Sequence, residues 1–283
     1  MDLTSIYSII NSYQTLIETE QDATLMTGLE IEQFACLDDN YGYLIHDASS
    51  GVTACIDTPD AEVIRQTLKN KGWRLTHIFN THHHPDHAGG NLSLQEETGC
   101  EIIGPVGEWE KIPGLTRAVD QGDMVVFGTH YFEIINVGGH TLGHIAYFNR
   151  QEKLAFVGDA LFALGCGRMF EGTPAQMWAS LSRLNRLPQD TQIFCAHEYT
   201  LANAAFALSI DPDNPDLKAR VLDIQARREQ NLPTVPSLLG LEQKTNPFLR
   251  VTDPTIRAGM NMLDASSIDV FAEMRQRKDN FKG

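Results

Sequence analysis

Hydrophobic positions from residue 29 onward form short strand-like runs that alternate with helical patterns. Runs rich in β-branched and aromatic residues, bounded by turn residues, predict strands over residues 29–37, 41–45, 52–57 and 75–80. Between the third and fourth strands, Ala61, Ile64 and Leu68 recur at helical spacing. Gly72 follows them, which predicts that this helix ends there. A second helix is expected over residues 90–98.

The alternation continues to about residue 200, and a potential ligand follows each of three strands. These strands are predicted over residues 131–137, 154–157 and 192–195, with a helix beginning at Thr173-Pro174 between the last two. His140, Asp159 and His197 come just after the three strands. Open sheets commonly place their sites at the carboxyl ends of strands, so we expect these side chains to meet.

The two ends of the chain have helical patterns. After Thr200 the strand signals stop, and helices are expected from Asn214-Pro215 and over residues 268–278. Residues 1–27 form an N-terminal extension with the pattern of an amphipathic helix and without Lys or Arg, which excludes a secretory signal and a transit peptide. Three alternatives are open for this helix. It packs on the body of the protein, it binds a partner, or translation starts at Met26 and the segment is not part of the native protein. We therefore divide the chain into residues 1–27, 28–200 and 201–283.

Composition restricts the classes of function. Hydrophobic residues make up 42% and charged residues 21% of the chain, as in soluble globular proteins, and no apolar run approaches the ~18–20 residues that span a membrane. The net charge of −15 argues against a nucleic-acid partner. Five scattered cysteines without a C-x-x-C motif favour reduced thiols and a cytoplasmic location. We expect no membrane partner and a monomer.

Residues 81–87, Thr-His-His-His-Pro-Asp-His, concentrate metal-binding side chains in one short loop. Imidazole and carboxylate groups together suit zinc, manganese or iron. His82 and His84 are two residues apart, so in an extended segment they point the same way. Asp86 and His87 follow a proline that stiffens the turn and aims this pair elsewhere. One loop therefore serves two metal ions, an arrangement typical of hydrolytic sites.

Seven side chains are candidate ligands: His82, His84, Asp86, His87, His140, Asp159 and His197. Taken singly, a histidine is more often a surface or hydrogen-bonded core residue, and an aspartate after a strand is more often a cap or turn former. The loop favours ligation, because two ions with about four to six ligands each need partners from elsewhere in the chain. His83, between two candidates, is expected to point away and to be structural.

Further motifs resemble a known family. The loop at 81–87, Gly139-His140-Thr141 and the surroundings of Asp159 resemble the metallo-β-lactamase superfamily. The hydroxyacylglutathione hydrolases (glyoxalase II family) are the members it resembles most, through the strings Gly-Asp-Ala-Leu-Phe at 158–162, Gly-Cys-Gly-Arg-Met-Phe-Glu-Gly-Thr at 165–173, Cys-Ala-His-Glu-Tyr-Thr at 195–200, Asn-Pro-Phe-Leu-Arg at 246–250 and Arg-Lys-Asp-Asn-Phe at 277–281. The resemblance extends from about residue 29 to the C-terminus.

This resemblance implies an α+β fold and a binuclear hydrolytic site. The fold is an αββα metallo-β-lactamase sandwich over residues 28–200, followed by a small α-helical, glutathione-binding domain over 201–283. Two divalent ions per subunit are implied, with zinc as the first expectation and iron or manganese as the alternatives. One takes His82, His84 and His140, the other takes Asp86, His87 and His197, and Asp159 bridges both. A divalent ion lowers the pKa of bound water from about 15.7 to about 7, and we expect Asp86 or Asp159 to orient this nucleophile.

The implied substrate is a glutathione thioester, S-D-lactoylglutathione, cleaved to D-lactate and glutathione in methylglyoxal detoxification. Arg275 and Lys278 match family positions that hold the glycine carboxylate of glutathione. Arg168 and Tyr199 match two other glutathione-contacting positions. Without the resemblance, the basic C-terminal stretch would be interpreted as a solvated helix face. Phe170 is a departure, because some family members have a tyrosine here, and one substrate hydrogen bond is therefore in doubt.

Other functions within and beyond the superfamily compete with this interpretation. A persulfide dioxygenase with one iron would not need Asp86, His87 and His197, and all three are present. A lactonase or a β-lactamase has the same loop but not the strings in the second half. A nucleic-acid-processing member would carry a more basic surface, and a flavodiiron protein would need a flavin domain for which the chain is too short. A non-catalytic binding module would ordinarily have lost ligands.

Overall fold

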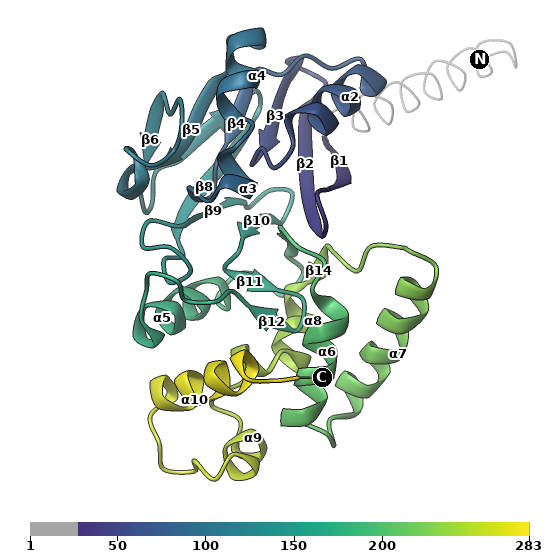
Figure 1. Cartoon of the computed structure of the whole chain (residues 1–283), viewed down its shortest axis with the longest axis vertical. Coiled ribbons are helices and arrows are strands. Elements are labelled where there is room, and N and C mark those ends of the chain that lie inside the picture. Colours follow the sequence, from purple (N-terminus) through teal and green to yellow (C-terminus); the bar gives the residue numbers. More distant parts are fainter. Residues whose placement is uncertain (1–27, 283) are drawn as a thin grey trace, which may run out of the picture.

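The fold is built on two facing mixed β-sheets with helices on their outer sides (Figure 1). The computed structural model describes residues 28–282, so the helix predicted within residues 1–27 lies outside the described residues. The α+β sandwich with a helical C-terminal part confirms the fold class expected from the sequence.

The first sheet has six strands in sequence order: β1 (Leu29–Cys36), β2 (Asn40–Asp47), β3 (Val52–Ile56), β4 (His77–Phe79), β5 (Glu101–Pro105) and β6 (Arg117–Val119). The first three strands pair antiparallel, and β3 to β6 pair parallel. In β2, Tyr43 and Ile45 face the second sheet while Leu44 faces the helical side. This alternation is the period of two that a strand between two apolar layers requires.

The second sheet has the order β14-β13-β10-β9-β8-β7, with β7 (Met124–Phe127), β8 (His130–Asn136), β9 (Ile145–Asn149), β10 (Leu154–Gly158), β13 (Gln192–Cys195) and β14 (Ser237–Leu238). Strands β10 and β13 are parallel, and the other neighbours are antiparallel. A small hairpin, β11 (Leu161–Phe162) and β12 (Gly165–Cys166), follows β10. The expectation of no strand after Thr200 is wrong at β14, whose two residues are too few to produce a pattern.

The helices are α2 (Ala61–Lys71), α3 (Pro85–Ala88), α4 (Asn91–Thr98), α5 (Pro174–Leu184), α6 (Thr200–Ile210), α7 (Pro215–Glu229), α8 (Leu239–Thr245), α9 (Pro254–Gly259) and α10 (Ser267–Asp279), with short 3₁₀ turns η1 (Val106–Glu108) and η2 (Pro247–Leu249). Helix α2 ends at Gly72, as predicted, because this glycine adopts the left-handed conformation (φ 68°). Helix α5 begins with a capping box between Thr173 and Gln176. Among the described helices, none has the length and apolarity to cross a bilayer.

One apolar core joins the sandwich to the C-terminal helices. It includes Phe79 and Phe156 from the two sheets together with Phe206, Phe248 and Phe271 from the helical part. The backbone N–H of Tyr41 also donates to the Ala196 carbonyl (2.7 Å), which links the sheets at one end. The strands β3, β4, β10 and β13 end near this point, and the helical part packs beside it (Figure 1).

Candidate metal centre and substrate pocket

Three imidazoles converge at the end of β4. His82 is fully buried, His84 is the residue before α3, and His140 comes from the loop after β8. His84 Nδ1 lies 3.1 Å from His82 Nε2 and 3.0 Å from His140 Nε2. One nitrogen of each ring lies within 4.8 Å of the others. The spacing of two between His82 and His84 therefore brings both rings to one point.

Neighbouring groups fix the orientation of these rings. His140 Nδ1 lies 2.8 Å from the Arg168 carbonyl, and His82 Nδ1 lies 3.0 Å from the Thr81 hydroxyl. A carbonyl oxygen can only accept, so His140 carries its proton on Nδ1 and turns the lone pair of Nε2 toward the cluster. A hydrogen bond of this kind selects the tautomer that a metal ligand needs.

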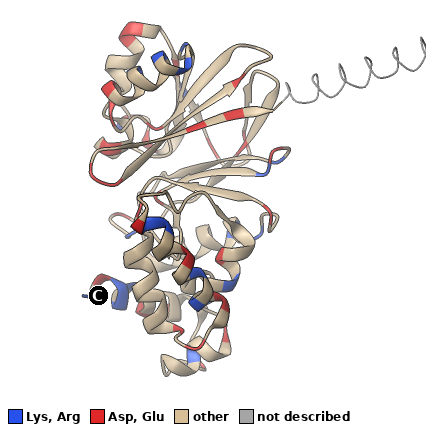
Figure 2. Ribbon diagram, turned by 90° about the vertical axis from the view of Figure 1, so that its right-hand side faces the viewer, with Lys and Arg blue, Asp and Glu red and all other residues tan. Residues whose placement is uncertain are grey.

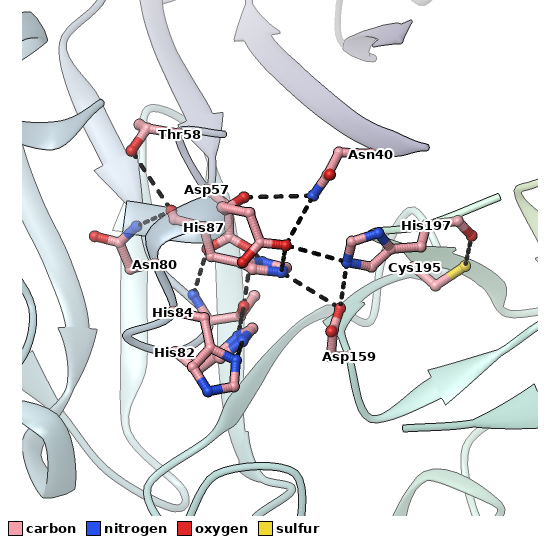
Figure 3. A network of polar contacts seen from close by, with 12 residues as sticks. Asn40, Asp57, Thr58, Asn80, His82, His84, His87, Asp159, Cys195 and His197 are labelled. Carbon is pink, nitrogen blue, oxygen red and sulfur yellow. Dashed lines mark hydrogen bonds and ion pairs between the residues drawn. The ribbon is translucent and has the colours of Figure 1, made fainter. Parts of the chain in front are cut away.

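A second group, Asp86, His87 and His197, lies on the other side of the loop. One ligand atom of each again lies within 4.8 Å of the others. His87 Nδ1 donates to Asp57 (2.8 Å; Figure 3). His197 Nδ1 donates to Asp39 (2.8 Å), so the Nε2 atoms of both rings face the group. The carboxylate Oδ2 of Asp86 is 3.5 Å from each of these two Nε2 atoms.

Asp159 stands between the two groups. Its Oδ1 is 3.5 Å from His87 Nε2 and 3.4 Å from His197 Nε2 (Figure 3). Its Oδ2 is 3.4 Å from His140 Nε2. The preceding residue, Gly158, has φ of 48°, and a Cβ there would lie 2.5 Å from the Thr81 hydroxyl. Only glycine fits this turn, and the turn aims Asp159 at both groups.

The electrostatics of the cluster suit metal ligation. Burial lowers the pKa of His82, His84 and His140, which keeps these imidazoles neutral. Burial alone would lower the pKa of His87 too, but the carboxylates of Asp159 and Asp57 outweigh it and raise the pKa to about 9. These carboxylates favour a cation at this point, and a bound metal ion would replace the proton that the ring otherwise carries at neutral pH. Burial would likewise raise the pKa of Asp159, yet His87 and His197 hold it below the usual range.

Two buried polar atoms at the centre have no hydrogen-bond partner. They are His87 Nε2 and Asp159 Oδ1, and they face each other across 3.5 Å. Unpaired buried polar groups typically cost about 1–3 kcal/mol each. A divalent cation between them would bind both, so the chemistry of this donor set fits a metal ion.

Several supporting residues escaped the sequence analysis. Asp57 accepts from the Thr81 backbone N–H (2.7 Å) as well as from His87, and Asp39 holds His197. Asp57 follows β3 just as Asp159 follows β10, and the same strand-end argument would have identified it. Asp39 lies between the strands predicted over residues 29–37 and 41–45 and was not among the candidate residues. His144 also supports the site, because its Nε2 accepts the Asp159 backbone N–H (3.1 Å).

A pocket of about 490 Å³ opens beside the metal-binding groups. Its wall includes His140 and Asp159 from the metal-binding groups together with three cations, Arg168, Arg275 and Lys278. Figure 2 shows basic residues at the C-terminal end of the chain, where α10 supplies two of these cations. The acidic chain thus has a local basic surface next to the cluster.

The candidate substrate-binding residues differ in solvent exposure and in whether their side chains already have hydrogen-bond partners. Arg168 is largely exposed, and its Nε lies 3.6 Å from Asp279. Arg275 is 4% exposed, and its guanidinium already donates to the Cys166 carbonyl (2.9 Å) and to Asp279 (2.8 Å). Lys278 is half-buried and donates to the Ala202 carbonyl (2.9 Å).

Four aromatic residues also line the pocket, and two of them, Tyr199 and Phe170, lie beside metal-binding histidines. The ring of Tyr199 stacks on His197 with centroids 4.8 Å apart and a 3° angle between planes. Phe170 is 64% exposed, and its ring lies 5.2 Å from that of His140. The position at which the sequence departs from the family therefore lies directly beside the first histidine group.

Comparisons with known proteins agree with this geometry. A family model for the metallo-β-lactamase superfamily matches residues 56–197, and one described as hydroxyacylglutathione hydrolase C-terminus matches residues 198–281. A hydroxyacylglutathione hydrolase of Maricaulis maris is 53% identical over 256 residues, which cover 90% of this chain and all of the relative. One from Erythrobacter litoralis is 54% identical over 253 residues, which cover 89% of this chain and all of the relative.

Solved structures share the fold at low sequence identity. ETHE1 from Myxococcus xanthus superimposes with a TM-score of 0.62 at 24% identity, covering 88% of this chain and 97% of that one. A metallo-β-lactamase from Staphylococcus aureus gives a TM-score of 0.62 at 20% identity, covering 89% of this chain and 72% of that one. The sequence relatives confirm the resemblance inferred from the motifs. This chain belongs to the hydroxyacylglutathione hydrolase family of the metallo-β-lactamase superfamily.

Proposed function

We propose that this protein hydrolyses S-D-lactoylglutathione, a 2-hydroxyacylglutathione thioester, to D-lactate and glutathione. The observation that carries the proposal is that one pocket is lined by His140 and Asp159 together with the cations Arg168 and Lys278. A thioester carbonyl beside the metal-binding groups would thus lie within the same pocket as cations able to hold an anionic glutathione. The names of the relatives support the same substrate class.

We assign two divalent metal ions to the cluster, with zinc as the first choice and iron or manganese as the alternatives. His82, His84 and His140 would hold one ion, Asp86, His87 and His197 the other, and Asp159 both. When bound, such ions bring the pKa of water toward neutrality and stabilise developing negative charge on oxygen. The alternative group of Asp57, His82 and His87 is within ligand distance. We assign Asp57 a supporting role, because its Oδ2 accepts the Nδ1 proton of His87.

The residues of the chain orient the reactants and move the proton. Asp86 and Asp159 orient the attacking water, and the proton of this water leaves to solvent on the side of Asp86, whose carboxylate is 38% exposed, against 10% for Asp159. Arg168, Lys278 and Tyr199 bind glutathione, with Arg275 behind them in the wall. The expelled thiolate is a good leaving group, so the reaction needs little acid assistance.

A thioester hydrolysis assay tests the proposal. The metal-loaded chain should consume S-D-lactoylglutathione with loss of the ultraviolet thioester absorbance, and chelation should abolish the reaction until metal is restored. Asp159→Ala should lose at least about 100-fold in kcat, as expected when a group that orients the nucleophile and holds the metals is removed. Negligible turnover by the metal-loaded wild-type chain would refute the assignment.

We also propose that the protein acts as a monomer in the cytoplasm. The proposed ligands and the pocket lining all come from one chain. All five cysteines are free and buried, which suits a reducing compartment. Sedimentation of the purified protein would test the monomer, and fractionation of the source cells would test the location.

A further inference from the structure

His83, the middle histidine of the metal-binding loop, turns away from the metal-binding groups and into a cluster of carboxylates. Its Nδ1 donates to Glu108 Oε2 (2.8 Å), and its Nε2 lies 3.6 Å from Glu171 Oε1. Its side chain is 18% exposed. Because His82 and His84 flank it directly, anything that holds this ring also fixes the backbone that carries both of them.

Glu108 ties this loop to the one that carries His140. Its carboxylate is 1% exposed and lies at the end of η1. While Oε2 binds His83, Oε1 accepts from the Thr141 hydroxyl and from the Gly143 backbone N–H (3.0 Å). The contact is tight, since a Cβ at Gly143 would lie 2.5 Å from Glu108 Cγ. One buried carboxylate therefore sets the separation of two ligand-bearing loops.

Glu171 holds the same two loops from the solvent side. Its Oε2 accepts the Leu142 backbone N–H (2.9 Å), and its own N–H donates to the His140 carbonyl (3.3 Å). Lys111 pairs with its Oε1 at 2.8 Å. His140 is thus bracketed, with Glu108 bonded to the residue after it and Glu171 bonded to its own carbonyl.

We propose that Glu108, together with His83 and Glu171, is a positioning clamp that sets the spacing of His82, His84 and His140. None of the three side chains lines the pocket that faces glutathione, so the clamp governs metal affinity and kcat more than substrate binding. This inference rests on the metal centre proposed above. It gives the otherwise unused His83 a role through its two carboxylate partners.

Metal affinity of isosteric variants tests the clamp. Glu108→Gln and His83→Asn in the full chain should weaken binding of Zn²⁺, measured by competition with a chelating dye, by roughly 10- to 100-fold. The visible spectrum of the Co²⁺-loaded variants should change, kcat should fall and KM should stay near the wild-type value. Both residues act through the hydrogen bond between His83 and Glu108. The Zn²⁺ affinity of the double variant should therefore be only slightly lower than that of the weaker-binding single variant. Glu133→Gln, which breaks the exposed ion pair with Arg150, is the matched control.

The outcomes separate the clamp from the function. Folded variants with wild-type Zn²⁺ affinity and an unchanged Co²⁺ spectrum would overturn the clamp, even in an active enzyme. Should Glu108→Gln fail to fold, His83→Asn and Glu171→Gln decide by the same measurements. A wild-type chain that binds Zn²⁺ but leaves the thioester intact would remove the proposed substrate, while weakened metal binding in the variants would still support the clamp.

Discussion

The ammonium group of Lys278 is partly buried and lies near another cation, and both conditions disfavour its positive charge. Its ammonium group lies 5.3 Å from the Phe206 ring centroid and donates to the Ala202 carbonyl. Burial first, and then the nearby charge of Arg275, lower its pKa to about 8. An anionic substrate binds the protonated form, so binding should weaken as the pH rises through this value.

The pH dependence of substrate capture therefore tests Lys278. We expect kcat/KM for the glutathione thioester to fall above about pH 8, by about tenfold or more, as a charge-assisted hydrogen bond worth about 1.5–3 kcal/mol is lost. Lys278→Arg stays charged and should keep kcat/KM constant over this range. Lys278→Ala should have a raised KM below about pH 8, a difference from the wild type that shrinks at higher pH, and a kcat near the wild-type value. Superimposable profiles of the wild type and Lys278→Arg would exclude Lys278 from binding.

Single residues were predictable where neighbours in sequence are neighbours in space. The spacing of His82 and His84 alone indicates a shared direction, and the two side chains do converge. Asp39 could not be assigned in this way, because it meets His197 across 158 positions of the chain. The Cys166 partner of Arg275 was equally hidden, because it lies 109 positions away in the chain. Asp279, the other partner of this guanidinium, is four residues further along α10, which is a spacing that a helical pattern does indicate.

At the scale of elements, a buried ion pair connects the helical part to the β11–β12 hairpin. Glu242 on α8 is fully buried and pairs with Arg220 on α7. Its other oxygen accepts from the Leu164 backbone N–H (2.9 Å) and from Asn246 (3.0 Å). Asn246 in turn donates to two carbonyls of the hairpin. This hairpin connects Asp159 to Arg168, so the ion pair supports the pocket from behind.

Removing Glu242 should therefore destabilise the protein strongly. Glu242→Ala leaves Arg220 buried without its partner, and we expect a loss of about 3–5 kcal/mol in the free energy of unfolding. Glu242→Gln should lose less, since its amide oxygen still accepts from Leu164. Urea unfolding of the metal-loaded proteins measures both. Glu229→Ala on the exposed end of α7 is the control and should stay within about 0.5 kcal/mol of wild type. An equally small effect of Glu242→Ala would contradict this account.

Elements with a regular pattern were predictable, and buried or very short ones were not. The helix closed by Gly72 and the strand at residues 192–195 match their predicted limits closely. Strand β9 is buried at all five positions, so it has no alternation to detect. Strand β10 is equally buried and was predicted only from its short apolar run before Gly158-Asp159. Helix α6 lacks a polar face of ordinary width, because alanine and other apolar residues surround it. A periodic pattern is visible only where one face of an element is apolar and the other is polar. Strand β9 and helix α6 show little difference between their faces.

At the scale of the whole molecule, the proposed metal ligands join segments that are far apart in the chain. His82 and His87 follow the first sheet, whereas His140, Asp159 and His197 follow strands of the second. The sequence placed these residues at strand ends but could not say that the two sheets meet there. That depends on the apolar surfaces between them, which bring the sheet edges together.

Metal binding should accordingly stabilise the entire fold. Free of metal, His87 Nε2 and Asp159 Oδ1 remain buried without hydrogen-bond partners, so the ions bind the folded chain far better than the unfolded one. At 100 times the dissociation constant, one such ion adds about 2.7 kcal/mol, which corresponds to about 5 °C or more in Tm. Calorimetry with and without chelator should show this loss, and added Zn²⁺ should reverse it. Asp159→Ala, which lacks the shared ligand, should respond much less to either treatment. A wild-type Tm that is unchanged by chelation, with metal release verified, would mean that these side chains hold the two sheets together without the ions.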